Sequence, residues 1–298
     1  MCVALAISLF AGCAHFESIE YSQEISEENP QTVEAFDQFI NDIFETEVTE
    51  NTINLHFTIS DPEKYGITED DFTSAELEAV PAANARDLGF DRSLIGAYGH
   101  DDRVCAYAEL AAILQLDVPE KTAVCIFADK EEIGSEGVSG MQSEAFEHFM
   151  KTLCGMQSVE LTDCFANSFC ISADVTAAYD PNFSEVYERR NAAYVNYGVG
   201  LCKYTGSGGK GGASDASAEV VGRIRRLFNG NGVMWQMAEL GKTDAGGGGT
   251  VAKYMAKRNI DTLDAGVPVL SMHAPYETVA KLDCYMTYKG MKVFFEQN

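Results

Sequence analysis

The chain has 298 residues, of which 46% are hydrophobic and 22% are charged. These fractions are ordinary for a globular protein with a sizeable core. The 46 acidic residues outnumber the 21 basic ones, and the net charge is −25. Nucleic acid is bound through Lys and Arg side chains that neutralise its phosphates, so this charge argues against a nucleic-acid partner.

The N-terminal segment, residues 1–18, begins with an apolar run that leads into Phe10-Ala-Gly-Cys13, which is similar to a lipoprotein cleavage site. A signal peptide needs a basic start, and the first Lys or Arg is Lys64. We therefore expect residues 1–18 to form a strand-like segment of the folded domain. No apolar run reaches the ~20 residues that span a bilayer, which predicts no membrane partner.

Nine cysteines are scattered along the chain without a Cys-x-x-Cys pair, and several stand inside apolar runs. An odd number of thiols in such surroundings favours a reducing cytoplasm over a disulfide framework.

Residues 19–87 are rich in acidic and polar side chains and are expected to form a shortened accessory or assembly segment. Apolar residues recur with helical spacing over residues 33–44, which predicts a helix. Residues 52–59 alternate between polar and apolar, which predicts a half-buried strand.

The remaining residues, 88–298, consist of short apolar runs separated by amphipathic stretches. Because such runs are typical of strands buried on both faces, we expect an α/β fold: a central, mostly parallel or mixed sheet with helices on both faces. The expected strands are residues 94–98, 122–128, 168–173, 198–204, 232–237 and 267–272, and the expected helices are residues 104–116, 141–154, 213–228 and 250–259.

Acidic residues or histidine follow four of these predicted strands. They are Asp101 with Asp102, Glu131 with Glu132, Asp174, and His273. Ligand sites of open α/β sheets collect beyond the carboxyl ends of strands, so we expect these side chains to meet at one edge. Carboxylates and imidazole are ligands of zinc, manganese or cobalt, and a two-metal hydrolytic site also needs one carboxylate that remains free to accept a proton.

Each of these residues also has a purely structural interpretation, because Asp and Glu after a strand commonly form turns or cap helices. His100 is interpreted as a neighbour of the site rather than a ligand. His56, in an alternating strand, and His148, on a helix of mixed polarity, are interpreted as structural.

Five motifs in order resemble one family of enzymes over about four fifths of the chain, from Tyr65 to the C-terminus. They are Tyr98-Gly-His-Asp-Asp-Arg-Val-Cys-Ala-Tyr107, Asp129-Lys-Glu-Glu-Ile-Gly-Ser135, Ser172-Ala-Asp-Val175, Asp180-Pro-Asn-Phe183 and Val269-Leu-Ser-Met-His-Ala-Pro275. Together they resemble the aspartyl aminopeptidase and vacuolar aminopeptidase I family, which are dinuclear zinc exopeptidases.

The resemblance implies an aminopeptidase with two divalent metal ions, zinc above all, that hydrolyses the first peptide bond of peptides with a metal-activated water. It implies that Asp101 bridges the two ions, or Asp102 if the register is shifted by one. Glu131 is then the general base, Glu132 and His273 hold one ion, and Asp174 holds the other. Family members assemble through an inserted domain, so a homo-oligomer is also implied.

The chain departs from the family at its front, where members carry a longer part of the catalytic domain. Cys13-Ala-His-Phe-Glu-Ser18 resembles the family's Ala-His-x-Asp-Ser motif, which makes His15 a candidate metal ligand. Residues 19–64 would then be a shortened inserted domain. The alternatives are an incidental His15 and a catalytically impaired or truncated relative that serves only as a structural or assembly subunit.

Two glycine clusters are the remaining feature. Residues 206–211 match G-x-G-x-x-G between a predicted strand and a predicted helix, which is the context of a dinucleotide-binding loop. The strand lies late in the chain, and arginines stand where the acidic partner is expected, so a nucleotide-binding oxidoreductase is disfavoured. We expect substrate contacts from Lys210 and from Gly247 and Gly248 of the second cluster. A close-packed turn is the alternative for that cluster.

Overall fold

The computed structural model describes residues 3–9, 44–49, 52–57, 66–76, 80–208, 211–242 and 244–297. The chain divides into two compact units, Met1–Gly12 together with Val80–Asn298, and Cys13–Ala79. In the second unit, β2 (Phe44–Thr49) and β3 (Thr52–Phe57) form an antiparallel hairpin, and α4 spans Glu69–Thr73. The helix expected over residues 33–44 lies outside the described residues, and the accessory role of residues 19–87 stays a prediction.

The first unit is built on a six-stranded sheet with the order β12-β9-β13-β7-β1-β6. Neighbouring strands are parallel except for β9 and β13, which run antiparallel. The strands are β1 (Val3–Leu9), β6 (Thr122–Ala128), β7 (Phe169–Ala173), β9 (Val199–Cys202), β12 (Trp235–Met237) and β13 (Asp261–Gly266). Four parallel strands, β6, β1, β7 and β13, therefore present their carboxyl ends at one edge.

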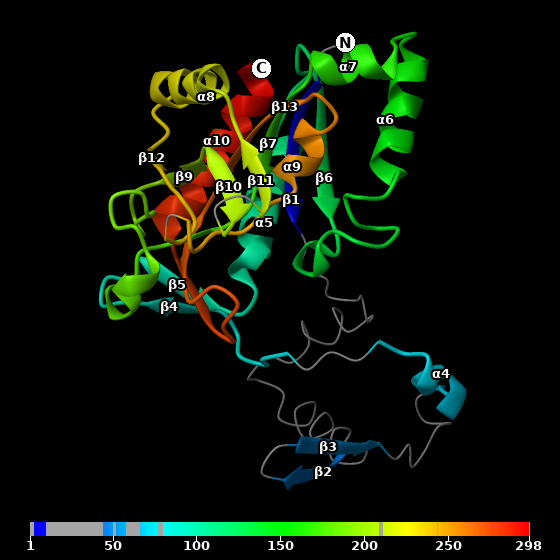
Figure 1. Ribbon diagram of the computed structural model, residues 1–298, viewed down its shortest axis with the longest axis vertical. Coiled ribbons are helices and arrows are strands. Elements are labelled where there is room, and N and C mark those ends of the chain that lie inside the picture. The colour runs from blue at the N-terminus through cyan, green and yellow to red at the C-terminus, as the bar shows by residue number, and fades with distance from the viewer. Residues whose placement is uncertain are drawn as a thin grey trace. The chain divides into compact units, whose positions relative to one another are not determined.

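Side-chain alternation along the strands divides the core into two layers. In β7, Phe169 and Ile171 join one hydrophobic cluster and Cys170 joins the other, as the two-residue period of a strand requires. The helices that complete these clusters lie on opposite faces of the sheet, as Figure 1 shows. One face carries α5 (His100–Leu114), α8 (Ala218–Gly230) and α10 (Lys281–Gln297), and the other carries α6 (Ala145–Met156), α7 (Leu161–Ala166) and α9 (Ala252–Ala256). The expected α/β class, with helices on both faces, is confirmed.

A second sheet of five strands continues from the carboxyl edge of the first, with the order β4-β5-β15-β14-β8. Its strands are β4 (Arg86–Leu88), β5 (Leu94–Ala97), β8 (Thr176–Ala177), β14 (Pro268–Leu270) and β15 (Glu277–Ala280). Only Asp174 and Val175 separate β7 from β8, and only Val267 separates β13 from β14. The two sheets therefore meet at Asp174.

The glycine motif at residues 206–211 does not lead into a helix. Strands β10 (Tyr204–Ser207) and β11 (Gly211–Asp215) pair as an antiparallel hairpin around it. The helix expected from residue 213 begins only at Ala218, where the hydroxyl of Ser217 accepts the N–H of Val220 and caps it. The prediction of a helix directly after this motif was therefore wrong. The motif also lacks the strand-to-helix turn that a dinucleotide-binding loop needs.

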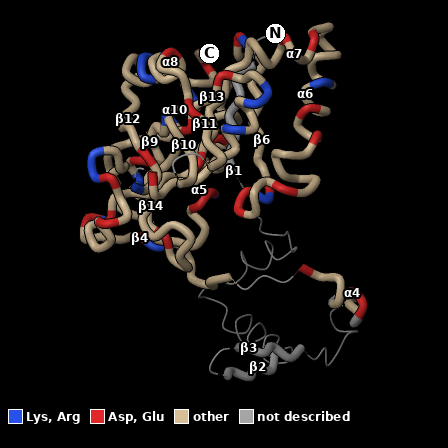
Figure 2. The backbone as a smooth tube through the Cα atoms, viewed as in Figure 1, with Lys and Arg blue, Asp and Glu red and all other residues tan. Residues whose placement is uncertain are grey.

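Acidic residues, red in Figure 2, are distributed over the helices and loops of the first unit, with basic residues between them. The described cysteines, seven in all, are free thiols. Within the described parts of the chain, no helix has the length and apolar character needed to cross a membrane.

Candidate metal centre

Asp101 lies at the junction between β5 and α5. Gly99 adopts a left-handed conformation (φ 70°), and Asp101 and Asp102 keep non-helical backbone angles before the regular helix begins. The N–H of Asp101 donates to Oε2 of Glu277 at 3.0 Å. This turn directs the Asp101 side chain toward the carboxyl edge of the larger sheet.

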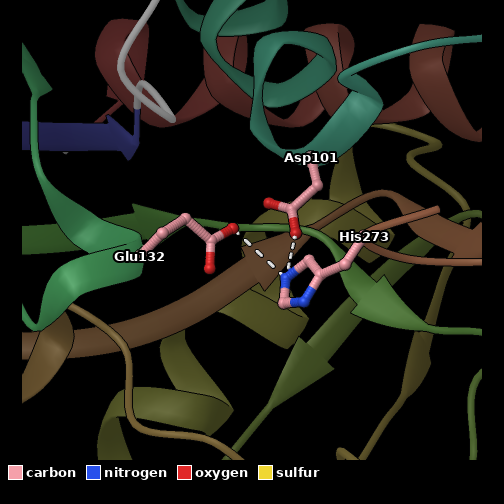
Figure 3. Close-up of side chains that lie close together, drawn as sticks. All are labelled: Asp101, Glu132 and His273. Atoms are coloured by element: carbon pink, nitrogen blue, oxygen red, sulfur yellow. Dashed lines mark ion pairs between the residues drawn. The ribbon is translucent and has the colours of Figure 1, made fainter. Parts of the chain in front are cut away.

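His273 follows β14 and faces Asp101. Its Nε2 lies 2.9 Å from Oδ2 of Asp101 and 3.2 Å from Oε1 of Glu132. Figure 3 shows both carboxylates converging on this one ring nitrogen. The backbone of His273 is left-handed (φ 63°), and its N–H donates to Oε1 of Glu277 at 2.8 Å.

Glu131 and Glu132 begin a short 3-10 helix (Glu131–Ile133) that follows β6. Lys130 before this helix and Gly134 after it are both left-handed, so the chain turns sharply on either side of the pair. Glu131 is half-buried, whereas Glu132 is exposed. The two neighbours therefore stand in different surroundings.

Asp174 connects the two sheets and belongs to a second group of acids. Asp101, Asp102 and Asp174 each offer a ligand atom within 4.8 Å of the others, as do Asp101, Glu132 and His273. Asp101 is common to both groups. The described residues therefore hold two overlapping sets of potential ligands that share one carboxylate.

Burial and mutual repulsion raise the pKa values of these carboxylates. Burial, followed by the charge of Glu132, raises the pKa of Asp101 to about 6. Burial and the charges of Glu132 and Asp101 raise the pKa of Glu131 to about 7. The pKa of Asp174 is raised well above its usual value by burial and by Asp102, Asp101 and Glu131. Burial and like charges both disfavour the ionised form, and a cation among these groups would offset both effects.

The donor chemistry fits a divalent metal. Carboxylate oxygens and an imidazole nitrogen are the ligands that zinc takes in proteins, and manganese and cobalt accept the same types. The nitrogen of His273 faces two acidic oxygens that come from different elements. One ligand atom of each of Asp101, Glu132 and His273 lies within 4.8 Å of the others, close enough for the three to share one metal ion.

The sequence predicted that all four strands that precede these residues belong to one sheet, and this was wrong. Glu132 and Asp174 follow β6 and β7 of the six-stranded sheet, whereas Asp101 and His273 follow β5 and β14 of the five-stranded sheet. The residues still come together because the second sheet continues from the carboxyl edge of the first. His100 points elsewhere, with its Nε2 3.3 Å from the carbonyl oxygen of Ile95.

Two of the predicted site residues, His15 and Lys210, lie outside the described residues. Gly247 lines a cavity of about 200 Å³ beside the β10–β11 hairpin. A Cβ atom added to Gly247 would lie 1.9 Å from the carbonyl oxygen of Gly206, and one added to Gly248 would lie 3.2 Å from the Leu240 side chain. Close packing therefore requires glycine at position 247, and the substrate contacts of both glycines stay predictions.

Sequence reasoning missed Glu277 altogether and treated Asp102 only as a substitute for Asp101. Glu277 is 2% exposed and accepts backbone N–H groups from both Asp101 and His273. An acid four residues after His273 was the available signal, but it carries no weight until the strand order is known.

The chain is similar to known proteins of one family. The sequence model of the aminopeptidase I zinc metalloprotease (M18) family matches residues 15–295. A probable M18 family aminopeptidase 1 from Borrelia garinii subsp. bavariensis is 48% identical over 242 residues, which cover 79% of this chain and 53% of that protein. Vacuolar aminopeptidase 1 of Saccharomyces cerevisiae is 26% identical over 243 residues, which cover 78% and 46% respectively.

The chain is also similar to a solved structure of this kind. The crystal structure of an M18 family aminopeptidase from Thermotoga maritima matches with a TM-score of 0.76 and 46% identity, over 80% of this chain and 54% of that chain. The chain thus spans about half the length of the curated relatives it matches.

Proposed function

Because the chain belongs to the aminopeptidase I zinc metalloprotease (M18) family, we propose that it hydrolyses the N-terminal peptide bond of peptides with Glu131 as the general base. The observation that carries this proposal is the convergence of Asp101, Glu132 and His273, with Asp101 shared by a second group that contains Asp174.

Two ions would be held by these residues, zinc first among the candidates. Glu132 and His273 would hold one and Asp174 the other, with Asp101 between them. Bound divalent ions supply Lewis-acid polarisation of the peptide carbonyl and make a water molecule more acidic.

Glu131 is suited to proton transfer by its position. It is half-buried beside Glu132 and belongs to neither group of potential ligands in the described residues. Because Glu131 holds neither ion in this assignment, its carboxylate is free to accept a proton. Glu131 takes the proton from the attacking water and passes it to the leaving amine.

The same acidic surroundings suit the free amino terminus of a peptide. Its ammonium group is a cation, and a cluster of carboxylates attracts it. We also propose that Lys210, Gly247 and Gly248 contact the rest of the substrate. The position of Gly247 supports this, because it lines the cavity of about 200 Å³ beside the hairpin. We also propose that the chain assembles into a homo-oligomer.

Replacement of Glu131 by Gln tests this assignment. The variant keeps the size of the side chain and removes the basic oxygen, so release of N-terminal residues from a panel of chromogenic aminoacyl substrates should fall by about 10²- to 10⁴-fold. Zinc content should stay at the wild-type level. Glu136→Gln is the matched control, because Glu136 is an exposed acid of the same loop, and it should retain wild-type activity.

Equal activity of the Glu131→Gln and wild-type chains would contradict the role of Glu131. A wild-type chain that holds zinc but releases no N-terminal residue from any member of the panel would instead favour the impaired relative that acts as a structural or assembly subunit.

A further inference from the structure

Glu277 occupies a position that the strand order makes special. It is the first residue of β15, and β15 lies between β5 and β14, running antiparallel to both. The carboxyl ends of β5 and β14 therefore both lie beside the start of β15. Asp101 follows one of these ends and His273 follows the other.

Both chain segments depart from strand geometry just past those ends. Gly99 (φ 70°) and His273 (φ 63°) are left-handed. The last ladder partner of β15 on one side is Ala97, and on the other it is Leu270. The N–H groups of Asp101 and His273 thus lie beyond the ladders and bond to the two oxygens of the Glu277 side chain, at 3.0 and 2.8 Å.

We propose that Glu277 is a positioning residue of the metal centre, which fixes the backbones of Asp101 and His273 so that their side chains converge. The inference rests on the proposed function, in which these two residues hold metal. A carboxylate has two acceptor oxygens and offers one to each N–H, whereas a carboxamide has one oxygen and would face the other N–H with its own donors. Because Glu277 is 2% exposed, water has little access to replace a lost acceptor.

The size of the effect follows from the role of such outer groups. Residues that orient metal ligands typically change metal affinity by about 10- to 100-fold when they are replaced. We expect this loss for Glu277→Gln, even though Glu277 itself contributes no ligand to either group of the described residues.

A second buried acid provides a matched control. Asp283, at the start of α10, is 0% exposed and accepts N–H groups from Asn196 at 2.6 Å and Gly198 at 2.7 Å. Like Glu277, it accepts two backbone N–H groups, but these belong to residues outside both ligand groups. A merely structural role for Glu277 predicts that Glu277→Gln and Asp283→Asn behave alike.

The test is zinc affinity, measured on the full chain by competition with a chromophoric chelator, together with thermal unfolding of the zinc-free protein. Both variants should lower the zinc-free unfolding temperature, but only Glu277→Gln should weaken zinc binding by 10-fold or more. Glu277→Asp keeps both oxygens and is one methylene shorter, so it cannot reach both N–H groups. It should show the same loss of affinity and replaces Glu277→Gln if that variant does not fold.

Zinc affinity of the Glu277 variants within twofold of wild type, or an equal loss in Asp283→Asn, would overturn the inference while leaving the proposed function intact. A wild-type chain that binds no zinc would overturn both.

Discussion

At the scale of single residues, the first unit is marked by buried carboxylates. Asp102, Asp264 and Glu277 are each at most 5% exposed. An ionised carboxylate loses its hydration on burial, and this cost must be met by hydrogen bonds or by a cation. Asp264 meets part of it with the hydroxyl of Thr250, which donates to Oδ1 at 2.7 Å.

Asp264 makes the stability of the fold depend on pH. Burial raises its pKa from 3.8 to about 6, although the hydrogen bond from Thr250 opposes the shift. Between these values the folded state binds more protons than the unfolded state, so the favourable contribution is complete below pH 3.8 and is lost as pH rises through 6. The difference corresponds to roughly 3 kcal/mol.

Asp264→Asn removes this titration. The free energy of unfolding of the wild type minus that of the variant should therefore fall by about 2–2.5 kcal/mol between pH 4 and pH 7, as measured by urea unfolding. Asp261→Asn, at the exposed start of the same strand, is the matched control for the loss of one negative charge. A difference that stays constant or rises over this range would disprove the assignment.

Much of the candidate site could be predicted residue by residue, because its members directly follow apolar strands. Asp101, Glu132, Asp174 and His273 stand at such positions, and the structure brings them together. Glu277 could not be predicted in this way. Its importance depends on β15 lying between β5 and β14, and the order of strands is not a local property of the sequence.

At the scale of elements, the two sheets are held together where β13 passes the segment after β7. Gly266 ends β13, and a Cβ atom added there would lie 1.8 Å from the carbonyl oxygen of Asp174 and 3.1 Å from Sγ of Cys105. The first distance is far too short for a real contact, so any side chain at position 266 must displace the backbone that carries Asp174.

Gly266→Ala should therefore lower the free energy of unfolding by about 1–3 kcal/mol or more, as overpacking of a core does. Gly155→Ala is the matched control, because Gly155 is exposed in α6 and an added Cβ would meet nothing within 4 Å. In a helix that change should raise stability by up to about 1 kcal/mol. Denaturant unfolding of both variants gives the comparison, and equal stability of Gly266→Ala and the wild type would refute this packing argument.

Elements with a clear apolar pattern were predictable, and those without it were not. Strands β6 and β7 lie where their apolar runs placed them. Strand β13 (Asp261–Gly266) was missed because it contains two aspartates and a threonine. Its two buried polar side chains are hydrogen-bonded, Asp264 to the hydroxyl of Thr250 and Thr262 to the carbonyl oxygen of Ile260, while Leu263 and Ala265 enter the core.

At the scale of the whole molecule, the fold class followed from alternating strands and helices, whereas the division into two sheets did not. Short connections, such as the single residue Val267 between β13 and β14, give no sign in the sequence that the chain passes from one sheet to another. The candidate site depends on that passage, because each sheet is followed by part of the set of potential ligands. Metal binding should therefore couple the two sheets and stabilise the folded state by an amount that grows with the logarithm of the free zinc concentration.

The number of zinc ions bound per chain is the decisive measurement for the proposed two-metal site. Equilibrium dialysis of the full chain against zinc, followed by elemental analysis, should find two ions per wild-type chain. Asp101→Asn should lose most of this binding, because Asp101 belongs to both ligand groups. A wild-type chain that retains no zinc, or an Asp101→Asn variant that retains as much as the wild type, would show that these residues do not form the proposed metal site.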